Sequence, residues 1–166
     1  MARKVKIDNR INTNKKITEA PICNNCPARI YQPNDAILKY GKGNLLPNYV
    51  FVLPPDAITN KWYEKYFKMV TDDLIDINVE YITYHPKCIA SSPVEEYGAF
   101  CTQYLMHEIR KLKPKKVIFF GVSIPTDVLS LSYAYGIEIY KLNNLLSIYY
   151  GEEKVSEFIN KLKQIL

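Results

Sequence analysis

The chain has 166 residues, of which 48% are hydrophobic, and a formal net charge of +5. This length can bury a full core without disulfide bonds or metals, so it predicts one ordinary domain. No apolar run reaches the roughly 18 residues that a membrane-spanning helix needs, and the charged N-terminus lacks a following apolar signal segment. We therefore expect a soluble, cytoplasmic protein with no membrane partner.

Positive charge is concentrated at the start of the chain. Residues 1–20 form a predicted basic arm, and residues 21–166 a single predicted domain. Such an arm is suited to phosphate contacts, which makes Arg3, Lys4 and Lys6 candidate DNA-binding residues. The alternative is that the arm is simply a solvated terminus.

The first predicted strand and helix follow a proline-containing segment. Val50–Leu53 is a short apolar run between prolines and is interpreted as a buried strand. A helix is expected over residues 59–74, because apolar residues recur there at helical spacing. They are Trp62, Tyr66, Met69, Val70 and Leu74. Residues 79–84 are expected to form the next strand.

A second helix is predicted by its N-terminal signal. Ser92–Glu95 reads as a capping box with proline at the first helical position. Pro114 is expected to end this helix. Its apolar face would consist of Cys101, Tyr104, Leu105, Ile109 and Leu112.

The C-terminal half continues the alternation of strand and helix. We expect strands at residues 117–121 and 137–140, and helices at about 124–131 and 155–166. Strands that alternate with helices predict a three-layer α/β/α fold around a central four-stranded parallel sheet.

Ligands of such sheets bind beyond the carboxyl ends of the strands. In this chain those ends are predicted at Leu53–Asp56, Tyr84–Cys88, Gly121–Ser123 and Leu142–Asn144. The third cysteine of the chain therefore falls at the edge where a functional site is expected.

The four cysteines of the chain are Cys23, Cys26, Cys88 and Cys101. The first two form a C-x-x-C, and four thiolates make a tetrahedral set suited to zinc or to an iron–sulfur cluster. Two disulfides and four unrelated buried thiols are the alternatives. Disulfides are disfavoured because the chain lacks a secretory signal.

The order of motifs resembles that of the iron–sulfur uracil-DNA glycosylases. The first matching features are Cys23-x-x-Cys26, the Gly41–Asn44 loop before a strand, and Tyr81–Thr83 leading to Lys87-Cys88. A second segment is similar to the family pattern P…E…C-x-x-Y-L…I…P-K-x-I…G. It consists of Pro93, Glu96, Cys101, Tyr104-Leu105, Ile109, Pro114-Lys115, Val117-Ile118 and Gly121. The resemblance covers about residues 23–130.

This resemblance implies a uracil-DNA-glycosylase-like fold and a [4Fe-4S] cluster on the four cysteines, with zinc as the alternative metal. It also implies a DNA-facing surface at the strand ends. The loop residues Gly41, Lys42, Gly43 and Asn44 are candidate DNA contacts, because glycines allow the backbone to approach a phosphate closely.

The first catalytic motif of the family, G-E-x-P-G, is only partly matched. Leu53 stands at the position of the water-placing glutamate, and Pro55 is the one matching residue. Asp56 is the nearby carboxylate that could orient water. Its alternative role is that of a helix-entry residue.

The other two catalytic positions also differ. Tyr84 stands where the family has an asparagine that reads the uracil edge, and Asn143 stands where it has a histidine. That histidine stabilises charge on the departing base, which an uncharged asparagine cannot do. His85 could act as a substitute donor, or could be a buried strand-end histidine. Leu53, Pro55, Tyr84 and Asn143 are therefore candidate substrate-binding residues, and Asp56, His85 and Asn143 candidate catalytic ones.

A preserved ligand set beside altered catalytic motifs favours a scaffold that has been reused for binding. The predicted function is that of an iron–sulfur DNA-binding accessory protein in replication or repair, with a possible protein partner from that machinery. One alternative is an active, divergent uracil-DNA glycosylase that flips its target base out of the helix. The other is a protein-interaction module that does not bind DNA. The bias towards Asn, Ile, Lys and Tyr suits an AT-rich genome, such as that of a bacteriophage or of a low-GC bacterium.

Overall fold

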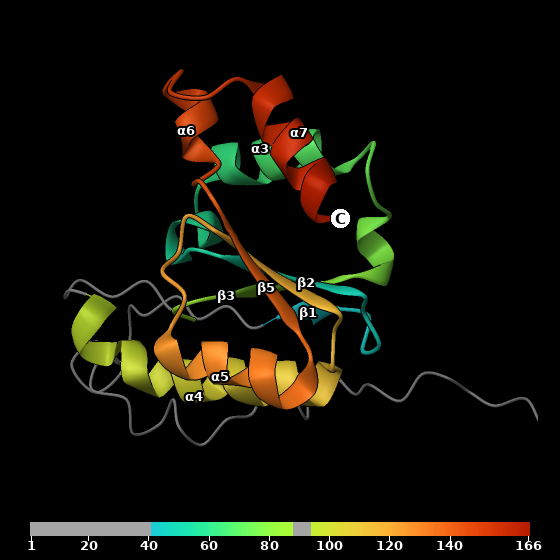
Figure 1. Ribbon diagram of the computed structural model, residues 1–166. Coiled ribbons are helices and arrows are strands. Elements are labelled where there is room, and N and C mark those ends of the chain that lie inside the picture. Colours follow the sequence, from blue (N-terminus) through green and yellow to red (C-terminus); the bar gives the residue numbers. More distant parts are fainter. Residues whose placement is uncertain (1–40, 88–93) are drawn as a thin grey trace, which may run out of the picture.

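The computed structural model describes residues 41–87 and 94–166. The basic arm with Arg3, Lys4 and Lys6, and the cysteines Cys23, Cys26 and Cys88, lie outside these ranges. Figure 1 shows three layers, in which a sheet lies between two groups of helices. One group consists of α3 (Lys61–Thr71), α6 (Leu146–Tyr149) and α7 (Val155–Ile165), and the other of α4 (Val94–Leu112) and α5 (Thr126–Tyr135).

The sheet has five strands in the order β1-β3-β2-β4-β5. They are β1 (Lys42–Gly43), β2 (Tyr49–Leu53), β3 (Tyr81–Tyr84), β4 (Lys116–Phe120) and β5 (Glu138–Leu142). The α/β class is confirmed, and β2 to β5 are parallel to one another. The expectation of four strands was wrong, because β1 adds a short antiparallel edge strand beside β3. Two residues are too few to produce a readable alternation in the sequence.

The order of the strands reverses at β2. The chain passes from β2 to β3 on one side, and then crosses back through α4 to β4 on the other. The helix after β2 covers one face of the sheet, and the helix after β4 covers the opposite face (Figure 1). The carboxyl ends of β2 and β4 therefore form a topological switch point, where parallel sheets of this kind bind their ligands.

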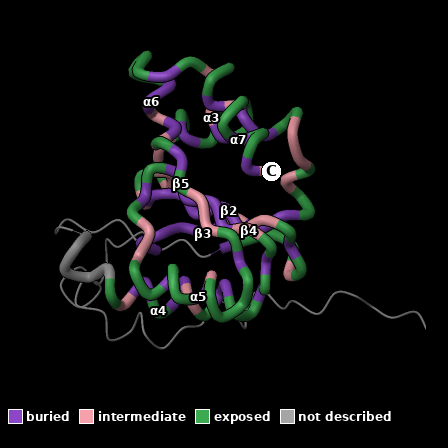
Figure 2. Tube along the Cα trace, in the orientation of Figure 1, coloured by how far each residue is buried: buried purple, intermediate pink, exposed green. Residues whose placement is uncertain are grey.

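Alternate strand residues supply two separate cores, one on each face of the sheet. Figure 2 shows buried residues along the central strands. The core beneath α3, α6 and α7 is rich in aromatic rings, including Phe51, Phe67, Phe120 and Phe158. The core beneath α4 and α5 is mainly aliphatic. This division follows from the two-residue repeat of a strand, which points successive side chains to opposite faces.

Helix α3 is shorter than expected and turned about its axis. It spans Lys61–Thr71, and Asn60 caps it by accepting a hydrogen bond from the Trp62 backbone N–H at 3.0 Å. The expected apolar face was partly wrong, because Trp62 and Met69 are 46% and 42% exposed. The residues that α3 buries are Tyr63, Phe67, Val70 and Thr71. Trp62 and Tyr63 each begin a set of apolar residues at helical spacing, so spacing alone did not show which of the two faces is buried.

The remaining elements agree with the predicted order and differ at their ends. Helix α4 ends at Leu112, just before Pro114 as expected, while α5 is longer than the predicted 124–131. Helix α6 was not predicted because its four residues are too short for a periodic pattern. None of the helices in the described ranges is long and apolar enough to cross a membrane.

Candidate functional site: the carboxyl-end edge of the sheet

Main-chain hydrogen bonds hold the ends of neighbouring strands together beyond the sheet. The N–H of His85 donates to the carbonyl oxygen of Leu53 at 2.9 Å, and the N–H of Gly121 donates to that of Leu142 at 2.9 Å. The segments after β2 and β3, and those after β4 and β5, therefore leave the sheet side by side. Because β2 to β5 are parallel, their carboxyl ends lie at one edge of the sheet; Cys88, the last residue of the second predicted end, lies outside the described residues.

Gly121 allows the turn after β5 to approach the end of β4 closely. Its φ of +67° lies in the left-handed region, and a Cβ atom there would be 2.5 Å from the Cβ and 2.6 Å from the Cα of Asn144. Any larger residue would be strained and would push the turn after β5 away from β4. The position of Asn143 and Asn144 at this edge therefore depends on a glycine in the neighbouring strand end.

A cavity of about 350 Å³ lies where β2 and β3 meet α3. Its lining includes Leu53 and Tyr84, both nearly fully buried, and Lys42 from β1. Burial raises the pKa of Tyr84, with Lys42 opposing and Glu64 reinforcing that shift. The structure thus brings together two candidate substrate-binding residues and one candidate DNA contact. A cavity of this size is within the range of small-molecule and cofactor sites.

The 3₁₀ helix η2 (Pro55–Ile58) connects β2 to α3 and carries two of the predicted residues. Pro55 is half-buried and begins this helix. Asp56 is exposed in its first turn, and its backbone oxygen accepts from the N–H groups of Thr59 and Asn60. This placement matches the helix-entry alternative for Asp56, and it leaves the carboxylate open to solvent.

His85 is buried at the end of β3. It is 5% exposed, follows the register pair Leu53–Tyr84, and precedes Pro86 through a cis peptide bond. Its Nδ1 atom has no hydrogen-bond partner among the described residues. Burial, followed by the positive charge of Lys87, lowers the pKa of His85 to about 4. The imidazole is therefore neutral near pH 7 and poorly suited to stabilising a departing anion as a cation.

The side chain of Asn143 is hydrogen-bonded to the carboxylate of Glu153. Its side-chain amide donates to Oε2 of Glu153 at 3.0 Å, and Ser147 and Lys161 also bond this carboxylate. Burial alone would raise the pKa of Glu153, but the hydrogen bonds from Lys161, Asn143 and Ser147 hold it below its usual value. Asn143 therefore helps to fix the turn between β5 and α7.

The sequence pattern did not predict the buried polar network that lies beneath β3. Lys87 and Glu108 are each fully buried and form an ion pair. Glu108 also accepts hydrogen bonds from Thr83 at 2.8 Å and from Tyr81 at 3.2 Å. Lys87 bonds Thr83 and places its Nζ 4.8 Å from the ring centroid of Tyr104. A glutamate among the apolar positions of α4 was the available signal, since buried charges need partners.

This network lies next to two of the predicted metal ligands in the sequence, Cys88 and Cys101. Cys101 is buried on α4, one turn before Tyr104. Tyr104 contacts Lys87, which is the residue directly before Cys88 in the chain. The turn of α4 near Cys101 is thus anchored beside the strand end that leads to Cys88. Within the described ranges, no three His, Cys, Asp or Glu side chains converge to hold a metal ion; Cys23, Cys26 and Cys88 lie outside them.

Of the candidate DNA contacts in the Gly41–Asn44 segment, two belong to strand β1. Lys42 pairs with Ile82 and Gly43 with Tyr81, so this segment is an edge strand rather than only a loop. Gly43 has a φ of +135°, and a Cβ atom there would be 2.1 Å from the carbonyl oxygen of Glu80. Glycine is required here by the neighbouring strand, which is a structural reason independent of any phosphate. Lys42 and Asn44 remain exposed.

Comparison with known proteins adds no assignment for this edge. The chain matches no protein-family model, and a search of curated proteins found no match.

Proposed function

We propose that this protein is a DNA-binding accessory domain of the iron–sulfur uracil-DNA-glycosylase type, acting in replication or repair without excising uracil. The proposal rests on the chemical character and burial of the residues at the carboxyl-end edge of the sheet. A cavity of ligand size lies there beside exposed basic residues, while the positions that hold catalytic groups in the resembled family hold groups unsuited to the reaction.

The loss of catalytic chemistry is supported residue by residue. Leu53 is apolar and 5% exposed, so it cannot place a water molecule. Tyr84 is buried in the wall of the cavity, where the family has an amide. Asn143 bonds Glu153, and His85 is buried with a pKa of about 4. Because positioning and electrostatic groups each contribute on the order of 10² or more to rate, their joint loss should remove most activity.

DNA binding is supported by charge and by position. Lys42, Lys61 and Lys68 line the cavity between α3 and strands β2 and β3, together with the carboxylates Glu64 and Asp72. The predicted basic arm adds Arg3, Lys4 and Lys6, which lie outside the described residues. Binding through such groups should be largely independent of sequence and should weaken steeply with salt.

The proposed cofactor is a [4Fe-4S] cluster on Cys23, Cys26, Cys88 and Cys101. It would tie the N-terminal segment to the end of β3 and to α4, and its role here would be structural. Protein purified without oxygen is expected to contain about four irons per chain. Cys101→Ser should lower the iron content, whereas stoichiometric zinc in the wild-type protein would contradict the cluster.

The decisive experiment measures binding and excision on the same oligonucleotides. Anisotropy titrations at several salt concentrations should show affinity for DNA with a steep salt slope. Replacing Arg3, Lys4 and Lys6 together by glutamine should weaken binding and flatten that slope. Absence of binding at low salt would contradict the proposal and favour a protein-interaction module.

Excision is tested by incubating excess protein with uracil-containing single- and double-stranded DNA, and then cleaving any abasic sites. We expect product at background level. Abasic sites well above background would instead support a divergent glycosylase. Loss of that activity in Asp56→Asn, with iron content unchanged, would identify Asp56 as the carboxylate that orients water.

A further inference from the structure

Three exposed aromatic side chains form a continuous cluster at the carboxyl-end edge. Trp62 comes from the first turn of α3, and Tyr149 and Tyr150 come from the end of α6. The ring centroids of Trp62 and Tyr149 are 5.4 Å apart, and those of Tyr149 and Tyr150 are 5.1 Å apart. Their exposed fractions are 46%, 47% and 68%, respectively. We call these three residues the aromatic platform.

The platform is held in place by the backbone beneath it. Asn60 caps α3 through the N–H of Trp62, and the N–H of Tyr150 donates to the carbonyl oxygen of Leu146 at 3.0 Å. Helices α3 and α6 lie on the same face of the sheet, and α6 follows the carboxyl end of β5 (Figure 1). The rings are thus presented by ordered elements beside the proposed DNA-binding edge. Exposed apolar groups that cluster in this way usually mark a binding surface.

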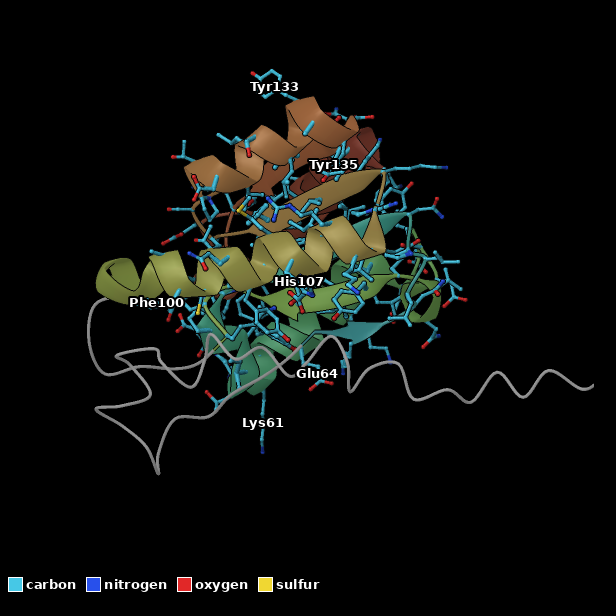
Figure 3. All side chains as sticks on the ribbon, turned by 90° about the horizontal axis from the view of Figure 1, so that it is seen from below. Lys61, Glu64, Phe100, His107, Tyr133 and Tyr135 are labelled. Carbon is cyan, nitrogen blue, oxygen red and sulfur yellow. The ribbon has the colours of Figure 1, made fainter. Side chains whose placement is uncertain are left out.

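Cations accompany the rings. Nζ of Lys65 lies 5.0 Å from the ring centroid of Trp62. Helix α3 also carries Lys61 and Lys68, and its only acid is Glu64, so its charged side chains sum to +2. Lys61 extends away from the body of the molecule in Figure 3. Lysine is depleted at protein–protein interfaces, whereas exposed rings beside cations are typical of sites for single-stranded nucleic acids.

An open hollow of about 450 Å³ lies next to Tyr150. The amide side chains of Asn143 and Asn144 line it, together with the carboxylates of Glu152 and Glu153. The carboxylates disfavour a phosphate in this hollow. Nδ2 of Asn143 donates to Glu153 and Oδ1 of Asn144 accepts from the N–H of Leu146, which leaves Oδ1 of Asn143 and Nδ2 of Asn144 to bond the edge of a base. A base that stacks on Tyr150 would therefore point its polar edge into the hollow and leave its phosphate towards the lysines of α3.

We propose that the aromatic platform is a stacking site for the bases of single-stranded DNA, with Lys61 and Lys65 neutralising the adjacent phosphates. This inference rests on the proposed DNA-binding function and specifies its strand form and its contact surface. Stacking needs no particular base, because every base offers a π face. The site therefore predicts a preference for single strands over duplex, with little sequence preference.

The experiment uses the fact that the chain has a single tryptophan, Trp62. A thymidine oligonucleotide of about 15 nucleotides is titrated into the full-length protein while Trp62 emission is recorded. A fluorescein-labelled copy of the oligonucleotide gives the affinity by anisotropy. We expect Trp62 emission to be quenched in step with binding, because a stacked base contacts the indole directly.

Substitutions separate stacking from general charge. Trp62→Ala and Tyr150→Ala should each weaken oligonucleotide binding by about fivefold or more, and should weaken duplex binding less. The matched control is Tyr133→Ala, because Tyr133 is 92% exposed and protrudes from α5 on the opposite face (Figure 3). It should bind like the wild type. Trp62→Phe keeps an aromatic ring and should retain most of the affinity, which guards against misfolding as an explanation.

Unchanged Trp62 emission at saturating oligonucleotide would overturn the platform. The same holds if Trp62→Ala and Tyr150→Ala bind single strands as tightly as Tyr133→Ala does. If DNA binding persists in either case, only this inference fails and the proposed function stands. Absence of binding to both single strands and duplex at low salt would remove the proposed function together with the platform.

Discussion

The two faces of the sheet are stabilised by different kinds of interaction. Under α3, α6 and α7, aromatic rings pack with centroids 5.7 to 5.9 Å apart, including the stacked pair Phe120 and Phe158. Under α4, the ion pair of Lys87 and Glu108 is fully buried within a mainly aliphatic layer. The same strands feed both faces, so the difference lies in the side chains that alternate along them.

The comparison indicates what each face contributes. The aromatic core uses only the buried side of α3, so the exposed side of this helix is free to carry Trp62 of the aromatic platform. A buried ion pair tolerates little substitution, because removing one partner leaves the other as an unpaired buried charge, which is strongly destabilising. The network therefore fixes the end of β3, where the chain passes from Lys87 to Cys88, relative to Glu108 and Tyr104 on α4.

The largest expected effect comes from breaking the ion pair. Glu108→Ala leaves Lys87 buried without its counter-charge, and should lower the free energy of unfolding by about 3–5 kcal/mol. Chemical denaturation measures the change. Lys87→Met combined with Glu108→Leu should recover much of the loss, because it removes both charges. Glu157→Ala, at an exposed site on α7, is the control and should change stability by less than about 0.5 kcal/mol.

A double variant no more stable than Glu108→Ala would show that the polar network is needed for packing itself. A loss below about 1 kcal/mol in the single variant would mean that water or another group compensates Lys87. Either result would contradict the view that the α4 face, unlike the aromatic face, is sensitive mainly to an unpaired buried charge.

The second prediction concerns pH and the end of β3. The pKa of His85 is lowered from 6.5 to about 4 by burial, and then by Lys87. The unfolded chain therefore binds more protons than the folded chain between these values. The free energy of unfolding should fall as pH decreases from about 6.5 to about 4, by up to about 3 kcal/mol.

Denaturation across this pH range tests the prediction, with His85→Asn as the variant. The free energy of unfolding should depend less steeply on pH in His85→Asn. The wild-type pH dependence should persist in His107→Asn, because His107 is exposed on α4. An unchanged slope in His85→Asn would assign the pH dependence to other groups.

The third prediction tests the aromatic face. Phe158→Leu removes one ring of the stacked pair with Phe120, whose planes are 13° apart, and leaves part of its volume unfilled. The expected loss is about 1–2 kcal/mol, smaller than that for Glu108→Ala, because no charge is left unpaired. Thermal and chemical unfolding measure it, and Leu46→Ala, at a residue that is 84% exposed, should be neutral. A loss equal to that of Glu108→Ala would erase the difference between the faces.

The smallest effect is expected from a substitution that removes one hydrogen bond from the network of Lys87 and Glu108. Tyr81→Phe removes the hydroxyl that donates to Glu108 at 3.2 Å, and keeps the ring. Burial, followed by the charge of Glu108, raises the pKa of Tyr81, so its hydroxyl is protonated and donates. The loss should be about 1 kcal/mol, since Thr83 and Lys87 still bond the carboxylate. Tyr133→Phe is the matched exposed control, and an equal effect in both variants would contradict the prediction.

The sequence by itself determined the order and type of the main elements. Apolar runs such as Val117–Phe120, set between breakers, indicated buried strands, and the periodicity of residues 155–165 indicated the terminal helix. It also placed the strand ends at one edge, because parallel strands with helical crossovers allow no other arrangement. These features depend on local spacing, which is readable without coordinates.

Only the tertiary structure decided which side chains are buried, paired or exposed. Trp62 and Tyr63 are adjacent, and each begins a set of apolar residues at helical spacing. Trp62 is nevertheless 46% exposed and Tyr63 fully buried, because α3 turns Tyr63 towards β4. Lys87 and Glu108 are 21 residues apart and meet only when α4 packs under β3. Such pairings arise from contacts between segments that are far apart in the sequence. Local periodicity does not indicate which of these contacts form.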